Sequence, residues 1–189
     1  LIFFYLGKSS VKRINFIEQL FLIFLVYTLT ALLISLPFYL SNYQVTFLNS
    51  FFEAISGVTN TGFTIFANIK YLDPTLILWR SSSQWIGGLY FLFFLILIFS
   101  NKQFNYKMNN LTYSGDGGIV TENNIKNLLL RIFLIYSSIS FFIFLLLNFV
   151  EVRMFNSLNL SMSLVSTGGF LPTDSLNKII TDNPQKLVL

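Results

Sequence analysis

The chain has 189 residues, of which 54% are hydrophobic and only 11% are charged, and its formal net charge is +4. An ordinary soluble domain has about 25% charged residues, so this composition predicts an integral membrane protein. The sequence contains no Cys and no His, which excludes disulfides, thiol nucleophiles and the usual zinc and haem ligands. Without these residues, and without paired acids in the apolar spans, we expect no enzyme activity. The small basic excess predicts no nucleic-acid partner.

The first part of the chain is predicted to be a tail, a turn and a spanning helix. Residues 1–13 are interpreted as the end of a preceding helix and a cytoplasmic turn. The apolar segment from Phe16 to Leu40 has the length needed to cross about 30 Å of hydrocarbon. Its acid, Glu18, lies at the entry end, where it suits a helix N-terminus. Pro37 is expected to kink or close the helix.

A short apolar segment and a polar stretch follow this span. The segment Thr46–Val58 is too short to cross the bilayer and predicts a re-entrant helix. The stretch Thr59–Thr64 is uncharged and rich in hydroxyl groups. Asp73-Pro74 is typical of a helix start, and a second spanning helix is predicted over Thr75–Phe99. Residues 14–100 therefore form a predicted helix–pore-loop–helix repeat with a re-entrant pore helix.

The second half of the chain has the same order of segments. Residues 101–124 are predicted to form a cytoplasmic linker, and a spanning helix is expected from Ile125 to Val150. The short segment Met154–Val165 and the polar stretch Ser166–Phe170 follow. Residues 125–189 are interpreted as a second repeat, truncated at the start of its last helix. Because the chain begins without Met and ends on the start of an apolar segment, we expect it to be a fragment of a longer protein.

The two halves match without a gap when the sequence is shifted by 107 positions. The matches are Asn49-Ser50 with Asn156-Ser157, Ser56 with Ser163, Val58 with Val165, and Gly62-Phe63 with Gly169-Phe170. Self-similarity at a fixed spacing indicates repeated architecture.

The charges predict one orientation in the membrane. Basic residues mark cytoplasmic ends, and seven of the twelve fall on one side: Lys8, Lys12, Arg13, Lys102, Lys107, Lys126 and Arg131. Acids predominate on the other side or its approaches: Glu53, Asp73, Glu151, Asp174 and Asp182. Both polar stretches then enter from outside, where acidic residues would concentrate cations.

The polar stretches are interpreted as parts of a selectivity filter. Irregular backbone is tolerated at membrane depth where it lines a water-filled or ion-filled cavity. Backbone carbonyls can replace the hydration shell of potassium, glycine permits the backbone conformations required, and the C-terminal end of a preceding helix favours a cation. The candidate ion-binding residues are Thr59, Asn60, Thr61, Gly62, Ser166, Thr167, Gly168 and Gly169. The alternative is that both stretches are ordinary hydroxyl-rich extracellular loops.

Two charged residues lie close to the first polar stretch. Arg80, within the predicted second span, is a functional candidate by default, or it snorkels to the interface or pairs with Glu53 or Asp73. We favour a structural role. Glu53, in the short helix, is expected to orient the filter by hydrogen bonds or to line the vestibule.

Several uncharged residues are assigned packing roles. Gly87-Gly88 is expected to permit close helix packing. Trp79 and Trp85 belong either to an interfacial belt or to helix packing. Phe63 and Phe170 are expected to pack behind the filter.

The chain resembles the Trk/Ktr/HKT superfamily of potassium transporters, and in particular its Trk-type membrane subunit. The resemblance is carried by three stretches: Phe51-Phe52-Glu53-Ala54-Ile55-Ser56-Gly57-Val58-Thr59-Asn60-Thr61-Gly62-Phe63-Thr64, Trp79-Arg80 with Gln84-Trp85-Ile86-Gly87-Gly88, and Val165-Ser166-Thr167-Gly168-Gly169-Phe170. It implies four such repeats around one pore, each with a key filter glycine, matched here by Gly62 and Gly169. Repeats three and four of the family pattern are missing from this sequence, so we expect the fragment alone not to conduct.

The resemblance also implies the function and the partners. Glycine rather than serine at position 62 points to potassium, and we expect potassium as the transported ion, with no covalently bound cofactor. The expected function is potassium uptake through a carbonyl-lined filter in the cell inner membrane, by a multi-pass protein surrounded by lipid. The family implies a homodimer and a cytoplasmic nucleotide-binding regulatory subunit. The alternative function is a non-conducting assembly or scaffold subunit.

Overall fold

The computed structural model of the chain describes residues 15–99 and 122–175. Its α-helices are α2 (Phe16–Tyr39), α3 (Phe47–Val58), α4 (Pro74–Phe99), α5 (Glu122–Phe149) and α6 (Met154–Ser166), and a 3-10 turn, η1, covers Ile69–Tyr71. All regular structure in the described ranges is helical, which confirms the predicted all-α class.

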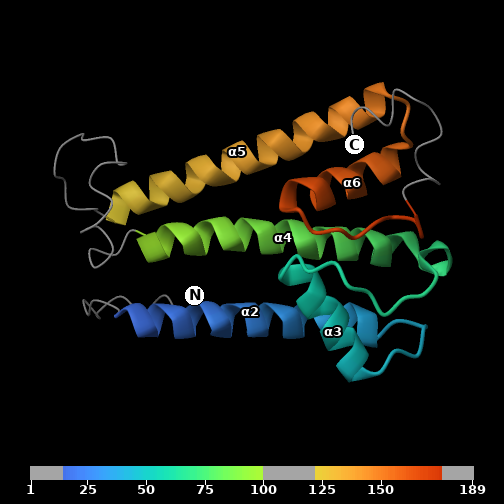
Figure 1. The fold of residues 1–189 in the computed structure, drawn as a ribbon, viewed down its shortest axis with the longest axis horizontal. Coiled ribbons are helices and arrows are strands. Elements are labelled where there is room, and N and C mark those ends of the chain that lie inside the picture. Colours follow the sequence, from blue (N-terminus) through green and yellow to red (C-terminus); the bar gives the residue numbers. More distant parts are fainter. Residues whose placement is uncertain (1–14, 100–121, 176–189) are drawn as a thin grey trace.

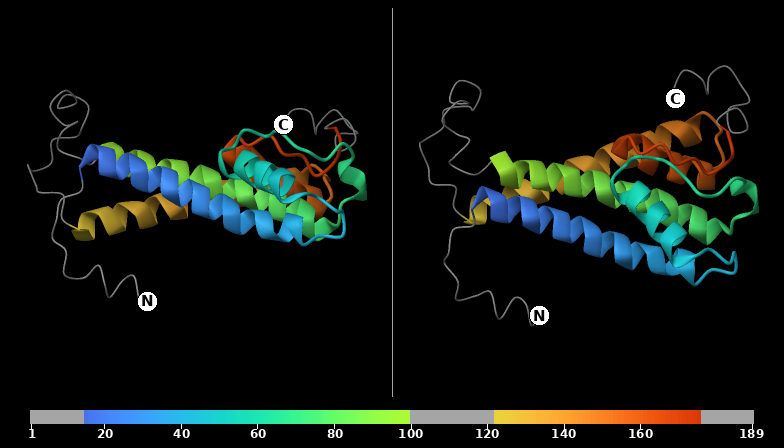
Figure 2. Two further views of the ribbon diagram at one scale, coloured as in Figure 1. Left: turned by 90° about the horizontal axis from the view of Figure 1, so that it is seen from below. Right: turned by 60° about the horizontal axis from the view of Figure 1, so that its bottom comes forward.

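The helices fall into three long ones and two short ones. The long helices α2, α4 and α5 lie side by side lengthwise (Figure 1), and each is long and apolar enough to cross a membrane. The short helices α3 and α6, of 12 and 13 residues, lie at one end of this bundle, in every view (Figures 1 and 2). They are too short to span hydrocarbon. Both end near the middle of α4 (Figure 1), so the polar stretches that follow them begin at mid-height of the long helices.

The helix boundaries lie close to those expected from the sequence. α4 begins at Pro74, as the Asp73-Pro74 pair predicts, and α2 continues through Pro37 for two residues before it ends at Tyr39. α5 begins at Glu122, three residues before the expected Ile125, so the end of the expected linker is helical.

Other expectations lie outside the described residues. These are the tail and turn over residues 1–13, most of the linker, the start of a last helix near the C-terminus, and five of the seven basic residues assigned to the cytoplasmic side.

The buried apolar core lies where the short helices meet the long ones. Ile34 and Phe38 of α2 pack with Ala54 and Val58 of α3. A second cluster joins α5 to α6 through Leu147, Val152 and Leu160. Much of the remaining surface of the long helices is exposed and apolar, as expected for helices that face lipid.

Helix α4 is the central element, because it packs against α2, α3, α5 and α6. Its glycine pair permits this. A Cβ on Gly87 would lie 2.1 Å from the backbone oxygen of Val58 in α3, and one on Gly88 would lie 2.6 Å from the hydroxyl of Tyr136 in α5. These distances leave no room for a side chain, in agreement with the expected packing role.

Two tryptophans fasten α4 to its long neighbours. The indole of Trp79 donates to the backbone oxygen of Ile34 in α2 at 3.0 Å, and that of Trp85 donates to the hydroxyl of Ser140 in α5 at 2.9 Å. Both therefore serve helix packing, which decides between the two roles left open by the sequence.

We predict that Gly87→Ala destabilises the protein by about 1–3 kcal/mol, because its Cβ would overlap a backbone carbonyl that cannot rotate away. The matched control is Gly57→Ala in α3, where the obstructing atom is the hydroxyl of the Ser83 side chain. In detergent, the thermal unfolding temperature should fall clearly for Gly87→Ala and less for Gly57→Ala. Equal unfolding temperatures for the two variants would contradict the packing assigned to Gly87.

Candidate functional site

Each polar stretch continues directly from the C-terminal end of a short helix. α3 is capped at its start by Thr46, whose hydroxyl accepts a hydrogen bond from the backbone N–H of Asn49 at 3.4 Å. At its end, the N–H of Thr61 donates to the oxygen of Ser56 at 3.0 Å. The equivalent bond closes α6, from the N–H of Gly168 to the oxygen of Ser163 at 2.9 Å. Both stretches thus leave their helices through the same turn.

The backbone conformations of the two stretches are also alike. Left-handed φ angles occur at Asn60 (55°) and Gly62 (77°) in the first, and at Thr167 (56°) and Gly169 (84°) in the second. Each pair of equivalent residues is separated by 107 positions. Because L-residues with side chains rarely adopt a positive φ, this recurrence cannot be ascribed to composition alone.

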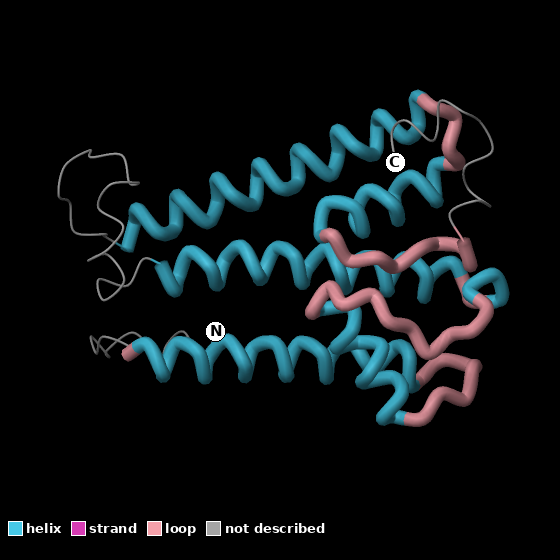
Figure 3. The backbone as a smooth tube through the Cα atoms, in the orientation of Figure 1, coloured by secondary structure: helices cyan, strands magenta, loops and turns pink. Residues whose placement is uncertain are grey.

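The two stretches lie against each other. A Cβ on Gly62 would be 2.5 Å from the backbone oxygen of Gly168, and one on Gly169 would be 3.8 Å from the Cα of Gly62. Figure 3 shows the two loops running side by side from near the middle of the long helices toward one end of the bundle. The two candidate filter glycines, far apart in the sequence, are therefore neighbours in space.

The eight candidate ion-binding residues do not all face the same open space. Thr59, Thr61, Thr167 and Gly169 are exposed, Asn60 and Gly62 are half-buried, and Ser166 and Gly168 are buried. The hydroxyl of Thr59 donates to the backbone oxygen of Ile55 at 2.7 Å and also lies 2.7 Å from the hydroxyl of Thr61. The hydroxyl of Thr167 donates to the backbone oxygen of Ser166 at 2.7 Å.

A hollow of about 350 Å³ adjoins both stretches on the side of the long helices. Its lining includes Thr59, Asn60, Ser166 and Thr167, together with Tyr27 of α2. Thr59 and Thr167 are the C-terminal caps of α3 and α6, so the negative ends of two helix dipoles adjoin the hollow. This geometry favours a cation over an anion.

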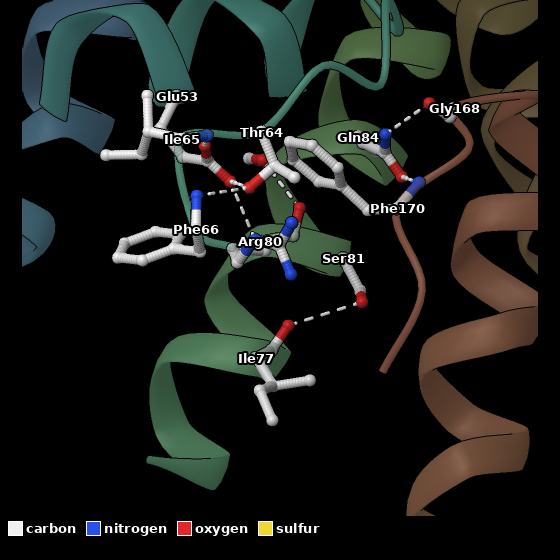
Figure 4. A network of polar contacts seen from close by, with 11 residues as sticks. Glu53, Thr64, Ile65, Phe66, Ile77, Arg80, Ser81, Gln84, Gly168 and Phe170 are labelled. Atoms are coloured by element: carbon white, nitrogen blue, oxygen red, sulfur yellow. Dashed lines mark hydrogen bonds and ion pairs between the residues drawn. The ribbon is translucent and has the colours of Figure 1, made fainter. Parts of the chain in front are cut away.

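Glu53 and Arg80 form a buried ion pair behind the first stretch, shown in Figure 4. The exposed fractions of the two side chains are 0% and 1%. The guanidinium Nε donates to Oε1 of Glu53 at 2.7 Å. The same carboxylate accepts from the hydroxyl of Thr64 and from the N–H of Ile65, each at 2.9 Å. Arg80 therefore pairs with Glu53 and not with Asp73, and Glu53 orients the chain after the first stretch instead of lining an open vestibule.

The guanidinium of Arg80 also contacts two aromatic rings. Its central carbon lies 4.2 Å from the ring centre of Phe170 and 5.8 Å from that of Phe66. Its two terminal nitrogens have no hydrogen-bond partner among the described residues. Phe170, with an exposed fraction of 2%, packs behind the stretches as expected, whereas Phe63 is 67% exposed and the expected packing role is wrong for it in the described part of the chain.

Gln84 of α4 is a site residue to which the sequence reasoning assigned no role. Its side-chain nitrogen donates to the backbone oxygen of Gly168, and its side-chain oxygen accepts from the N–H of Phe170 at 3.1 Å (Figure 4). The available signal was its spacing, because Gln84 lies one helical turn after Arg80 and so on the same face of α4.

Asn60 docks the first stretch on the same turn of α4. With its amide oriented to satisfy both partners, it donates to the backbone oxygen of Gln84 at 2.9 Å and accepts from the N–H of Gly88 at 3.0 Å. Its side chain is thus engaged with the helix, which leaves only its backbone carbonyl as a candidate ligand for an ion.

Comparison with known proteins relates this arrangement to cation transporters. No family model matches the chain. An uncharacterised cation transporter of Methanocaldococcus jannaschii is 27% identical over 71% of this chain and 28% of its own length. The Trk system potassium uptake protein TrkI of Halomonas elongata is 44% identical over 29% of the chain and 11% of its own length. The potassium uptake protein TrkG of Escherichia coli is 28% identical over 45% of the chain and 18% of its own length.

A solved structure shares the fold. The potassium transporter TrkH from Vibrio parahaemolyticus superposes with a TM-score of 0.76 and 21% identity, over 96% of this chain and 35% of that one. The chain thus spans about a third or less of the proteins that it matches. These relatives and the three apolar helices identify a multi-pass membrane protein. The resemblance inferred from the sequence is confirmed: the chain is a homologue of the Trk potassium uptake proteins and has the TrkH fold.

Proposed function

We propose that this chain supplies two segments of a potassium-selective filter in an uptake system of the cell inner membrane. The observation that carries the proposal is the pair of glycine-containing stretches, which follow two short helices in one backbone conformation and lie in contact. In the proposed mechanism, potassium loses water and passes backbone carbonyls at Thr59, Asn60, Thr61 and Gly62. It passes equivalent groups at Ser166, Thr167, Gly168 and Gly169.

The choice of potassium rests on the chemistry and on the relatives together. Carbonyl ligands suit potassium, and two helix C-termini adjoin the hollow beside the stretches. Two of the relatives are named as potassium uptake proteins. A ring of ligands needs carbonyls on every side of the ion, so two stretches form part of a filter and further segments complete it.

The proposal extends to the assembly. The chain performs no covalent chemistry, and potassium is its cargo. The homodimer and the cytoplasmic nucleotide-binding regulatory subunit implied by the family resemblance are included in the proposal, as is the division into repeats over residues 14–100 and 125–189.

Substituting Gly62 tests the filter. In Gly62→Ser, a side chain would be attached to a residue with a φ of 77°, and its Cβ would lie 2.5 Å from the backbone oxygen of Gly168. We therefore predict that this variant does not support potassium-limited growth when the complete gene is expressed in an uptake-deficient strain. Gly169→Ser is the matched control, because it imposes similar strain at a φ of 84° but has 3.8 Å of space. We expect the control to retain more growth. Equal rescue by wild type and Gly62→Ser would remove the role assigned to Gly62.

Glu53 and Arg80 are proposed to support the filter and not to bind the ion. Their carboxylate and guanidinium are buried, and the carboxylate fixes the chain at Thr64 and Ile65, where the first stretch ends. Removing one member of such a pair leaves an uncompensated buried charge.

We predict that Glu53→Gln destabilises the protein by about 3–5 kcal/mol, the usual cost of breaking a buried ion pair. The control is Glu18→Gln at the start of α2, where an exposed Glu18 accepts from the N–H of Asn15 at 2.9 Å and glutamine serves the same capping role. Thermal unfolding in detergent should separate the two variants by many degrees. Similar unfolding temperatures would show that the buried pair does not hold the site.

A further inference from the structure

The side chain of Gln84 contacts the peptide groups on both sides of Gly169. Its amide nitrogen bonds to the oxygen of Gly168 and its amide oxygen to the N–H of Phe170. Gln84 has an exposed fraction of 0%, and it belongs to α4, which follows the first stretch in the sequence. A side chain of the first repeat therefore holds the second stretch at its left-handed glycine.

Only a group that both donates and accepts can satisfy these two peptide groups together. A primary amide does so, whereas an aliphatic side chain does neither and a carboxylate cannot donate. Losing the amide would leave a buried carbonyl and a buried N–H without partners, which is costly. The peptide planes beside Gly169 would then be free to turn, and the directions of their carbonyls would no longer be fixed.

The contact also accounts for a difference between the repeats. Gly168 is equivalent to Thr61, which carries a side chain. A Cβ on Gly168 would lie 2.3 Å from the amide carbon of Gln84. The glutamine amide therefore occupies the space in which a side chain at position 168 would lie, so the second stretch needs glycine there. At the equivalent position of the first stretch, Thr61 carries a side chain.

The same turn of α4 holds the first stretch as well. The backbone oxygen of Gln84 accepts from the side chain of Asn60 at 2.9 Å. One turn earlier, Arg80 contacts the ring of Phe170 and, through Glu53, the hydroxyl of Thr64. The relative position of the two stretches thus depends on two successive turns of α4.

We propose that Gln84 is a positioning residue that determines ion selectivity, because its side-chain amide sets the carbonyl geometry of the second stretch around Gly169. The proposal rests on the filter function proposed above. Gln84 acts through the backbone of Gly168 and Phe170 and does not itself contact the ion.

Rubidium uptake by cells expressing the complete gene tests the transport consequence. For Gln84→Leu we expect the half-saturation concentration to rise at least about tenfold, the effect of losing hydrogen bonds to buried groups, and sodium to compete better. The amount of protein in the membrane should stay at the wild-type level. Asn148→Leu is the matched control, because among the described residues that amide donates to the oxygen of Phe144 in its own helix, at 3.0 Å, and to no group of either polar stretch. Wild-type half-saturation and sodium competition in Gln84→Leu would overturn the proposal.

A double-mutant cycle tests the contact without transport. Gly168→Ala should lower the unfolding temperature of the purified protein strongly in the wild-type background and much less with Gln84→Ala, which vacates the obstructed space. Thr61→Ala, at the equivalent position, should combine additively with Gln84→Ala. Additive effects of Gly168→Ala and Gln84→Ala would overturn the assigned contact, since coupling is expected only between residues that interact.

The two failures are distinguishable. A wild-type protein that takes up no rubidium would refute the filter function, and the cycle would still decide whether Gln84 and Gly168 are coupled. Wild-type uptake together with unaltered kinetics in Gln84→Leu would refute the positioning role alone.

Discussion

The structure depends on one constraint, which is that irregular backbone at membrane depth must find hydrogen-bond partners inside the protein. Helix α4 supplies them for both polar stretches. It carries Gln84, which bonds to the second stretch, and Arg80, which holds the carboxylate that bonds to the chain after the first. Polar side chains in a span would be unfavourable facing lipid, but on the buried face of α4 they supply hydrogen-bond partners to the backbone of the loops.

The two repeats fix the end of the polar stretch to the short helix in different ways. In the first, Glu53 of the short helix accepts a hydrogen bond from the hydroxyl of Thr64, the last residue of the stretch, at 2.9 Å. The equivalent residues of the second repeat are Leu160 and Leu171, and these belong to one apolar cluster. A hydrogen bond to a carboxylate in the first repeat thus corresponds to an apolar contact in the second. The backbone conformation is conserved between the two, and the side chains that stabilise it are not.

The sequence was informative where a pattern is local and weak where it depends on contacts between distant segments. Length and hydropathy predicted the three spans, and the short apolar segments predicted α3 and α6, because these properties belong to single stretches. Gly62 and Gly169 were selected because glycine permits conformations that other residues rarely adopt, and both have a positive φ. The role of Gln84 depends on a segment 84 positions away in the chain. Its helical spacing from Arg80 places it on the same face of α4, but that spacing does not indicate which segment it contacts.

The buried ion pair of Glu53 and Arg80 contributes a fixed carboxylate and a neutralised charge, rather than net stability. A buried ion pair adds little net stability, because desolvation offsets the attraction, and two terminal nitrogens of Arg80 lack partners among the described residues. What the pair supplies is a fixed carboxylate with three donors around it. A buried guanidinium without that carboxylate would repel any cation in the adjoining stretches. Glu53 therefore has two inseparable effects: it orients the backbone after the first stretch, and it cancels a positive charge close to a proposed cation path.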